Sequence, residues 1–434
     1  MKFLIHTLGC KVNHYESCMI REQLIAAGHT PCNEDGNPDI VVVNSCTVTS
    51  VADKKSLRAV RHFKRNGARV VALTGCVPQA YPETALATKE ADIVAGNKTN
   101  VKLVSAIEAF LKSNERTEIL EEHLSGDKFI PCSVTSFAER TRANIKIQDG
   151  CNRFCSYCAI PAARGRSRSK QLADIEAELS AIAEAGYKEV VFTGINLSSF
   201  GRDTGCDLAD AVRLACNTDG IERVRLGSLE PDHITDEMIE RLLDADGSTN
   251  KLCPQFHISL QSGCDSTLKR MNRHYDTAEF EHLCKKLRST FKNCTLTTDV
   301  MTGFPGESES DFETSLGFVE KIGFEKIHVF PYSPRENTRA YTMPDLPEKA
   351  VREGRCKKMI AVGDTVRLRY FNSLIGKTVN VLFETTEKDG TISGYTENYT
   401  PVKAKAPQTL CGTSVECEII GTEDDFCIGK LKQE

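Results

Sequence analysis

The sequence has no excess of positive charge and no stretch long enough to span a membrane. Its 434 residues carry 55 Lys and Arg against 60 Asp and Glu, a formal net charge of −5. This balance excludes a uniformly basic nucleic-acid-binding protein but leaves room for local basic patches. The apolar start is too short for a signal-peptide core, and no later run reaches the ~20 apolar residues of a membrane helix. We therefore expect a cytoplasmic protein without a membrane partner.

A disulfide framework is also not expected, although the chain has 19 cysteines. The number is odd, there is no export signal, and a chain of this length buries a core without covalent cross-links. In a reducing compartment so many cysteines indicate buried thiols, metal ligands or catalytic thiolates. Length and an ordinary globular composition predict two to four domains.

Residues 1–112 show the pattern of an α/β sheet. Buried strands are predicted at Phe3–Ile5, Ile40–Val43, Val70–Leu73 and Asp92–Ala95, with helices at Glu16–Ala27 and Val51–Lys64 between them. Residues 113–137 are polar and mixed, which is typical of a linker.

Residues 138–372 repeat strand and helix six times. The predicted strands are Asn144–Gln148, Val190–Phe192, Val224–Leu226, Phe256–Leu260, Leu296–Val300 and Ile327–Phe330. Six such units make an incomplete barrel with an open side, because a closed barrel of this kind needs eight. Residues 373–434 hold five short strands and an Asp389-Gly390 turn, which predicts a small antiparallel β-barrel.

Three cysteines follow the first strand of the six-unit repeat on one short loop. Cys151, Cys155 and Cys158 have the spacing C-x3-C-x2-C, and they are expected at the face of the barrel where active sites lie. Three thiolates at this spacing hold three irons of a [4Fe–4S] cluster and leave one iron open for a substrate. The alternatives are a zinc site, which lacks a second C-x2-C unit here, and three buried core thiols.

A second triplet comes from three separate strands. Cys10, Cys46 and Cys76 each follow a predicted strand by a few residues, so all three lie on one edge of the N-terminal sheet. We read Gly9 and Gly75 as positions that let the backbone approach a ligand. The residues alone leave two readings open, a second iron–sulfur cluster and three small buried side chains at strand ends.

Several segments together resemble the methylthiotransferases among the radical S-adenosylmethionine (SAM) enzymes, over essentially the whole chain. They are Thr7-Leu8-Gly9-Cys10-Lys11-Val12-Asn13, Cys155-Ser156-Tyr157-Cys158-Ala159-Ile160-Pro161, Arg164-Gly165-Arg166-Ser167-Arg168-Ser169, Ser228-Leu229-Glu230-Pro231, Ser259-Leu260-Gln261-Ser262-Gly263 and Gly303-Phe304-Pro305-Gly306-Glu307. The first and third of these are most similar to the branch that modifies threonylcarbamoyladenosine in tRNA.

The resemblance implies a reaction and its cofactors. Two [4Fe–4S] clusters, on Cys151/Cys155/Cys158 and Cys10/Cys46/Cys76, and two SAM molecules per turnover would place sulfur and a methyl group on carbon 2 of the adenine at tRNA position 37. A low-potential electron donor and a sulfur source are implied as further partners. Polar residues at strand ends are the expected SAM contacts, with turn formation as the alternative: Gly194, Asn196, Ser228, Glu230 and Gln261. Tyr157, between two cluster ligands, is expected to flank the adenine of SAM, with packing against the cluster as the alternative.

Binding of the tRNA anticodon loop requires local positive charge. Two basic segments are candidates: Lys54, Arg58, Arg61, Lys64 and Arg65, and, beside the cluster loop, Arg164, Arg166, Arg168 and Lys170. The alternative for the first is a solvated helix face. The C-terminal barrel resembles an RNA-binding TRAM domain, yet it is acidic. The rival functions are modification of isopentenyladenosine in tRNA, modification of an aspartate in a ribosomal protein, and a non-catalytic iron–sulfur RNA-binding protein.

Overall fold

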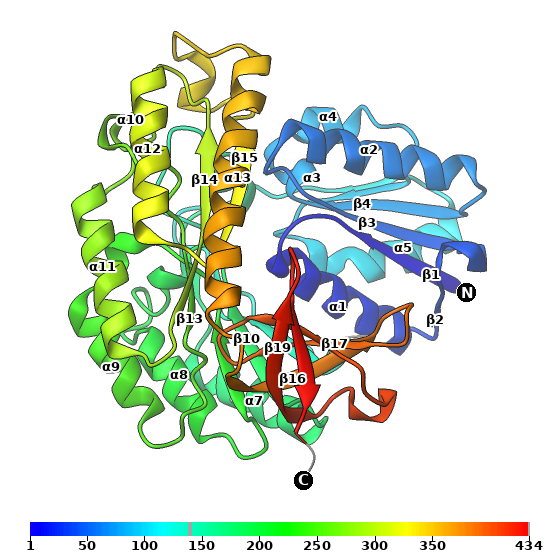
Figure 1. The fold of residues 1–434 in the computed structure, drawn as a ribbon. Helices are drawn as coiled ribbons and strands as arrows, with labels where there is room; N and C mark the ends of the chain where they lie inside the picture. Colours follow the sequence, from blue (N-terminus) through cyan, green and yellow to red (C-terminus); the bar gives the residue numbers. More distant parts are fainter. Residues whose placement is uncertain (138–140, 433–434) are drawn as a thin grey trace.

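The N-terminal part of the protein is a parallel sheet with helices on both faces. The computed structural model describes residues 1–137 and 141–432. The sheet has six strands in the order β2-β1-β3-β4-β5-β6, as Figure 1 shows at the blue end of the chain. Its strands are β1 Lys2–Thr7, β2 Thr30–Pro31, β3 Ile40–Ser45, β4 Val70–Gly75, β5 Ile93–Ala95 and β6 Thr117–Ile119, and its helices are α1 Lys11–Ala26, α2 Ser50–Arg65, α3 Cys76–Ala80, α4 Pro82–Leu86 and α5 Leu103–Ser113.

Strands β3 and β4 are buried on both sides because apolar residues occupy successive positions along them. Val42 and Ala72 pack into the core shared with α1 and α5, while Val41 and Val71 pack on the opposite face against α2. The predicted α/β sheet is confirmed, and the structure adds two edge strands, β2 and β6.

The predicted linker, residues 113–137, is more ordered than its composition indicates. It supplies the edge strand β6, which pairs with β5. Farther along, Val134 and Phe137 are buried, and the Tyr15 hydroxyl of α1 donates a hydrogen bond of 2.7 Å to the Cys132 carbonyl. The segment is therefore packed against α1. The predicted start of the next domain at residue 138 lies outside the described residues.

The central part is an open barrel built from two parallel sheets, in the orders β11-β10-β7 and β12-β13-β14-β15. An isolated bridge between Val224 and Leu252 joins them, and β7 and β15 end the series at its two sides. The strands are β7 Arg142–Lys146, β10 Glu189–Thr193, β11 Arg223–Leu226, β12 Ser228–Leu229, β13 Gln255–Ile258, β14 Thr295–Thr302 and β15 Lys326–Pro331. All six predicted strands are present, so the incomplete barrel is confirmed, with the short β12 as an addition.

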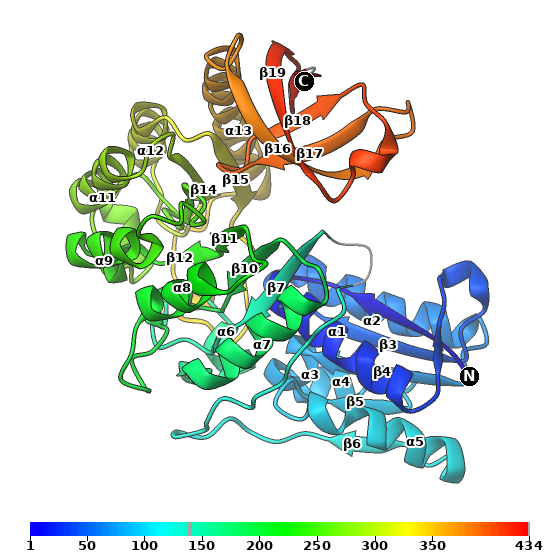
Figure 2. The same cartoon turned by 90° about the horizontal axis from the view of Figure 1, so that it is seen from below.

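Helices cover the outside of this partial barrel, as Figure 2 shows. They are α7 Leu172–Glu184, α8 Leu208–Asn217, α9 Asp236–Asp246, α10 Asp265–Arg270, α11 Thr277–Thr290, α12 Glu309–Ile322 and α13 Lys349–Asn372, while α6 Ile160–Arg164 packs against α3 of the N-terminal part. A two-stranded antiparallel pair, β8 Gln148–Asp149 and β9 Arg168–Ser169, follows β7. Short 3₁₀ helices lie at Glu34–Gly36, Asn100–Lys102, Leu197–Ser199, Pro231–His233, Arg339–Thr342 and Gln408–Leu410.

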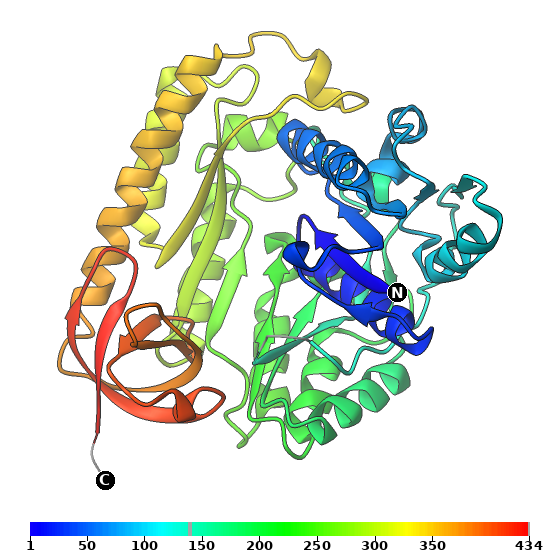
Figure 3. The ribbon, with the colours of Figure 1, turned by 90° about the vertical axis from the view of Figure 1, so that its right-hand side faces the viewer.

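The C-terminal part is a closed five-stranded barrel in the order β16-β17-β18-β20-β19, which confirms the predicted barrel, although β18 and β20 pair in parallel and not antiparallel as expected. Its strands are β16 Thr378–Thr386, β17 Ile392–Thr396, β18 Pro401–Ala404, β19 Ser414–Thr422 and β20 Cys427–Leu431. The long helix α13 connects it to the partial barrel (Figure 3). Among the described residues, every helix is too short or too polar to cross a membrane.

The N-terminal sheet and the partial barrel are held together by buried polar contacts. Lys146 of β7 pairs with Glu16 of α1 at 2.7 Å, and Arg335, after β15, pairs with Asp53 of α2 at 2.6 Å. These ion pairs fix the N-terminal sheet beside both sides of the open barrel.

Candidate active site

The loop that carries Cys151, Cys155 and Cys158, called the cluster loop below, follows β8. It turns sharply at Gly150, which has a φ of +70°. A Cβ at this position would collide with the backbone carbonyl of Arg166, so only glycine fits. The Cys151 amide then donates to the Gly165 carbonyl at 3.0 Å, and the Cys158 amide donates to the Cys155 carbonyl at 3.0 Å. These bonds hold the three-cysteine segment against the loop that carries Arg166.

The three thiols of this loop share one small space. Burial, together with the neighbouring Cys155 thiol, raises the pKa of Cys158 to about 12 and raises that of Cys151. Three donors contact the sulfur atoms: Arg273 Nη1 lies 3.4 Å from Cys155 Sγ, and the Arg153 amide and Asn196 Nδ2 lie 3.4 and 3.8 Å from Cys151 Sγ. A guanidinium beside a thiol favours the thiolate that an iron requires.

The second triplet is also brought together. Asn13 of α1 lies below it, with its Oδ1 atom 3.8 Å from Cys10 Sγ and 3.9 Å from Cys76 Sγ. The Asn13 Nδ2 group donates to the Leu8 and Ser45 carbonyls at 2.8 and 2.9 Å. Asn13 therefore fixes the ends of two strands and contacts two of the three thiols.

Cys46 completes this triplet, and the two glycines explain how closely it is packed. A Cβ on Gly9 would lie 3.0 Å from Cys46 Sγ, and one on Gly75 would lie 2.5 Å from Asn44 Oδ1. Both glycines have positive φ, +105° and +94°. A larger side chain at either position would collide with the neighbouring strand end. The contacts of these glycines therefore differ from our prediction that they let the backbone approach a ligand.

Arg164 joins the segment that follows the cluster loop to the second triplet. It ends α6, six residues after Cys158, and its side chain is completely buried. It donates to Glu16 Oε1 at 2.5 Å and to Asn13 Oδ1 at 2.6 Å, so its charge acts on the thiols of Cys46 and Cys76. Burial raises the pKa of Cys76 to about 12, and Arg164 opposes that rise. This arginine holds a positive charge where an anionic cluster would lie.

The prediction that Arg164, Arg168 and Lys170 contact RNA is wrong, because all three side chains are buried in ion pairs. Arg168 donates to Asp149 at 3.1 Å, and Lys170 pairs with the fully buried Glu178. Only Arg166 of this segment is exposed, and its guanidinium lies 4.5 Å over the Phe154 ring. On α2, by contrast, Lys54, Arg58, Arg61 and Arg65 are exposed, and Lys64 pairs with Asp92 at 2.7 Å.

Three of the residues expected to contact SAM differ in their hydrogen bonds and ion pairs. The Asn196 Oδ1 and Gln261 Oε1 atoms are buried and lack a hydrogen-bond partner among the described residues. Gln261 also has a φ of +65°, a strained conformation that is common at functional sites. Glu230 pairs with Arg273. Asn196 contacts the Cys151 thiol directly, and Glu230 approaches the Cys155 thiol through Arg273.

The other three residues expected to contact SAM are described by their packing or exposure. A Cβ on Gly194 would lie 2.8 Å from Gln148 Oε1, so this glycine is needed for packing of the strand ends. Ser228 is exposed at β12. Tyr157 packs edge-on against Phe304, with ring centroids 6.2 Å apart. This contact agrees with the alternative in which Tyr157 serves packing.

Arg273 and Asn13 were missed by sequence reasoning. Arg273 lies just beyond α10 and reaches Cys155 from more than 100 residues along the chain. No spacing pattern connects it to the cluster loop. Asn13 does have a signal, because it follows Cys10 by three residues at the start of a helix.

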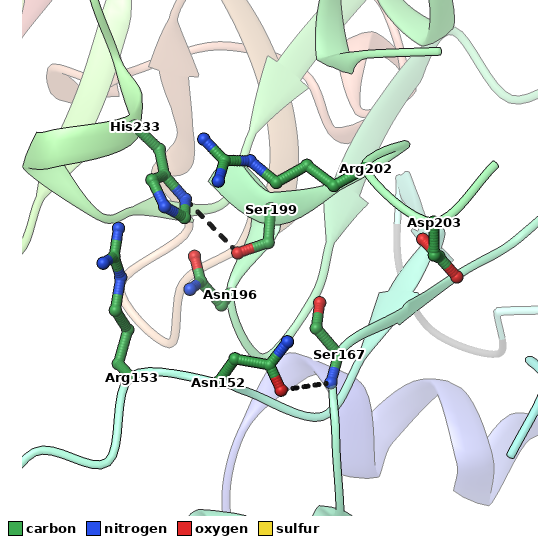
Figure 4. Close-up of a pocket in the computed structure, with 8 residues that line it drawn as sticks. All are labelled: Asn152, Arg153, Ser167, Asn196, Ser199, Arg202, Asp203 and His233. Atoms are coloured by element: carbon green, nitrogen blue, oxygen red, sulfur yellow. Dashed lines mark hydrogen bonds between the residues drawn. The ribbon is translucent and has the colours of Figure 1, made fainter. Parts of the chain in front are cut away.

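A polar cavity of about 270 Å³ opens beside the cluster loop. Figure 4 shows its lining: Asn152, Arg153, Ser167, Asn196, Ser199, Arg202, Asp203 and His233. The Ser199 hydroxyl lies 3.3 Å from His233 Nδ1. Burial, reinforced by Arg153 and Arg202, lowers the pKa of His233 to about 3, so its imidazole is neutral at pH 7. Through Asn196, this cavity reaches the thiol of Cys151.

The donor sets suit iron–sulfur clusters better than zinc. Each triplet offers three thiols and a buried arginine, Arg273 or Arg164, which fits an anionic cluster held at three corners, whereas a structural zinc site takes four protein ligands.

Comparisons with known proteins agree with this geometry. Residues 145–319 match the radical SAM superfamily, and residues 2–96 match the uncharacterized protein family UPF0004. The chain is 35% identical to the threonylcarbamoyladenosine tRNA methylthiotransferase MtaB of Bacillus subtilis, over 96% of this chain and 93% of the relative. It is 38% identical to the MtaB of Thermotoga maritima, over 91% and 89%. A tRNA-2-methylthio-N(6)-dimethylallyladenosine synthase of Clostridium botulinum is 31% identical over 89% and 87%.

Among solved structures, the radical SAM methyltransferase TsrM of Kitasatospora setae covers 78% of this chain and 74% of its own, with a TM-score of 0.55 and 14% identity. This likeness concerns the fold alone. The partial barrel, the three-cysteine loop and the family match define a radical SAM protein, which implies SAM and a [4Fe–4S] cluster as cofactors. Within that class, the chain belongs to the methylthiotransferase family represented by MtaB.

Proposed function

We propose that this protein adds a methylthio group to carbon 2 of threonylcarbamoyladenosine at position 37 of tRNA. The observation that carries the proposal is the pair of thiol triplets, the second of them beside the buried Arg164, in a chain similar to MtaB over nearly its whole length. In this proposal residues 1–112, 138–372 and 373–434 form three domains, and residues 113–137 connect the first domain to the second.

In this proposal Cys151, Cys155 and Cys158 hold one [4Fe–4S] cluster, and Cys10, Cys46 and Cys76 hold a second. When bound, the clusters and two SAM molecules per turnover supply the radical chemistry, the sulfur and the methyl group. A low-potential electron donor and a sulfur source are further partners.

The side chains around the cluster loop have distinct proposed tasks. Arg273 donates a hydrogen bond to the Cys155 sulfur at 3.4 Å and holds Glu230 in place. The unpartnered amide oxygens of Asn196 and Gln261 are acceptors for N–H or O–H groups of SAM. The exposed cations of α2 and Arg166 bind tRNA phosphates.

The experiment is anaerobic reconstitution with iron, sulfide, SAM and one of three tRNAs: unmodified, threonylcarbamoylated or isopentenylated. A methylthio mass gain on the threonylcarbamoylated tRNA alone is expected. A gain only on the isopentenylated tRNA would assign the protein to the sister activity, and no gain on any tRNA would contradict the proposal.

Two cysteine variants sharpen this test. Cys76→Ser is expected to remove about half of the bound iron and all methylthio transfer, while reductive SAM cleavage at the other cluster continues. Cys411→Ser, on a half-buried cysteine of the C-terminal barrel, is the control and should leave iron content and activity unchanged.

A further inference from the structure

The inner face of the partial barrel is polar. Along β7, Ala143 and Ile145 face the helices and join the apolar core, so Arg142, Asn144 and Lys146 face the interior. The alternation on β11 likewise places Val224 outside and Arg225 inside. A closed barrel of this kind has an interior filled by apolar layers, and the polar interior here is suited to a polar ligand.

The C-terminal barrel reaches this interior through the turn between β17 and β18. Arg225 Nη1 donates to the Glu397 carbonyl at 3.0 Å, and the Thr295 hydroxyl donates to the Asn398 carbonyl at 2.6 Å. The next residue, Tyr399, has a φ of +66°, which is strained for an aromatic side chain. The turn thus brings Tyr399 to the start of β7 and β11, in the region where Figure 2 shows β17 beyond the ends of these strands.

Cations surround the Tyr399 ring. The guanidinium carbons of Arg142 and Arg225 lie 5.2 and 4.8 Å from its centroid. Arg142 also donates a hydrogen bond to the phenol oxygen, a bond that does not use the phenol O–H. Burial alone would raise the pKa of Tyr399, but Arg142, Lys11 and Arg225 together lower it.

Several cations gather at this place. Glu189 pairs with Arg225 at 2.8 Å and Glu384 pairs with Arg142 at 2.7 Å, while Arg223 lies 3.9 Å from Glu189 and the charge of Glu189 also acts on Lys11. The buried Nη2 group of Arg225 has no hydrogen-bond partner among the described residues, and a buried charged donor without a partner is costly. The site therefore has spare capacity for an anion.

Lys11 ties this positive region to the reacting atoms. It follows Cys10 directly, is exposed, and lies near enough to Tyr399, Arg142 and Arg225 for their charges to act on it. In the proposed reaction, sulfur held at the Cys10 triplet reaches carbon 2 of the adenine. The threonylcarbamoyl group is attached through carbon 6 of the same ring and ends, a few bonds away, in a carboxylate, whereas the sugar and phosphates leave from the opposite side.

We propose that Lys11 and the Tyr399 hydroxyl, with Arg142 holding the phenol, form the site that binds the carboxylate of the threonylcarbamoyl group. The C-terminal barrel then contributes a substrate-specificity residue to the active site. This inference rests on the proposed function, and it predicts which chemical feature of the substrate the enzyme recognises.

The test compares two anticodon stem-loop RNAs, one carrying threonylcarbamoyladenosine and one in which the threonyl carboxylate is a neutral carboxamide. A hydrogen bond to a charged group is worth about 1.5–3 kcal/mol, or roughly 10- to 150-fold. The unaltered enzyme should prefer the carboxylate by such a factor in kcat/KM. Lys11→Met and Tyr399→Phe should each lower kcat/KM on the carboxylate RNA and leave the carboxamide RNA nearly unaffected.

Iron content and tRNA-free SAM cleavage are measured for every variant, with Lys112→Met at the end of α5 as the control for removal of a lysine. If Lys11→Met disturbs the adjacent cluster, Tyr399→Phe decides, since it is not adjacent to any cysteine ligand. Equal activity of the unaltered enzyme on both RNAs would overturn the inference, as would equal decreases on both RNAs in the variants. Failure of the proposed function is distinguishable, because the unaltered enzyme would then modify neither RNA.

Discussion

Two basic segments of similar composition have opposite environments. Residues 164–170 hold four cations, and three of them are buried in ion pairs with carboxylates from other segments. Helix α2 also carries a run of cations, but its side chains are mostly exposed, and carboxylate partners are found for Lys64 at 2.7 Å and for Arg61 at 3.9 Å. The first segment is part of the interior of the protein, and the second forms part of its surface.

The difference shows what determines the role of a basic segment. The partners Glu16, Asp149 and Glu178 are themselves buried, and unpaired they would be costly inside the protein. A cation that neutralises such a group is not available to a phosphate. Arg164, although close to the cluster loop in sequence, is therefore a structural and electrostatic support. Helix α2 remains the candidate RNA-binding surface.

The largest effect is expected for Arg164→Met. It leaves Glu16 buried with one fewer cation and removes the positive charge beside the thiols of Cys46 and Cys76, so it should destabilise the protein by about 3–5 kcal/mol. The measurements are the urea midpoint of the apoprotein and the iron content after reconstitution, which should fall toward that of one cluster.

The matched control is the double variant Glu16→Gln with Arg164→Met, which removes both charges. It should recover much of the stability, because a buried pair is replaced by neutral groups, but not the iron of the second cluster. Unchanged stability of Arg164→Met, together with full iron content, would contradict the role assigned to this arginine.

The sequence predicted most of the fold, since strand and helix periods are local patterns. Cys151, Cys155 and Cys158 could be found because their spacing is local as well, and the second triplet because parallel strands end at one edge. The burial of Arg164 and Lys170 could not be predicted, because Glu16 and Glu178 approach them only after the sheet, the linker and the barrel have packed together. Arg273 was missed for the same reason: its contact with Cys155 is created by the fold.

A second, smaller effect distinguishes the two segments by pH. Burial alone would raise the pKa of Asp149, but Lys146, Arg164 and Arg168 lower it well below its ordinary value; Arg164 and Lys146 do the same for Glu16. Carboxyls with a lowered folded-state pKa stabilise the protein above their unfolded pKa of about 4, and this stability is lost as the pH falls toward the folded value.

The urea midpoint should therefore fall steeply as the pH drops below about 5. In Asp149→Asn the protein should be less stable at pH 7 and the acid decline should be shallower. Neutral substitutions on α2 should leave the decline unchanged, because its cations have few carboxylate partners. An equally steep decline in Asp149→Asn would place the acid sensitivity elsewhere in the protein.

The smallest effect on stability, and the clearest effect on tRNA binding, is expected from α2. Replacing Lys54, Lys55 and Arg58 with Gln should change stability by less than about 0.5 kcal/mol, because the side chains are exposed. The logarithm of tRNA affinity should depend less steeply on the logarithm of salt, by about 0.7 for each phosphate of a single-stranded segment that the variant no longer neutralises. Lys188, Lys285 and Lys349, exposed elsewhere, provide a charge-matched control. Equal salt dependence in both triple variants would mean that α2 is a solvated surface, and Lys11 and Arg166 would then be the leading candidates for binding the tRNA.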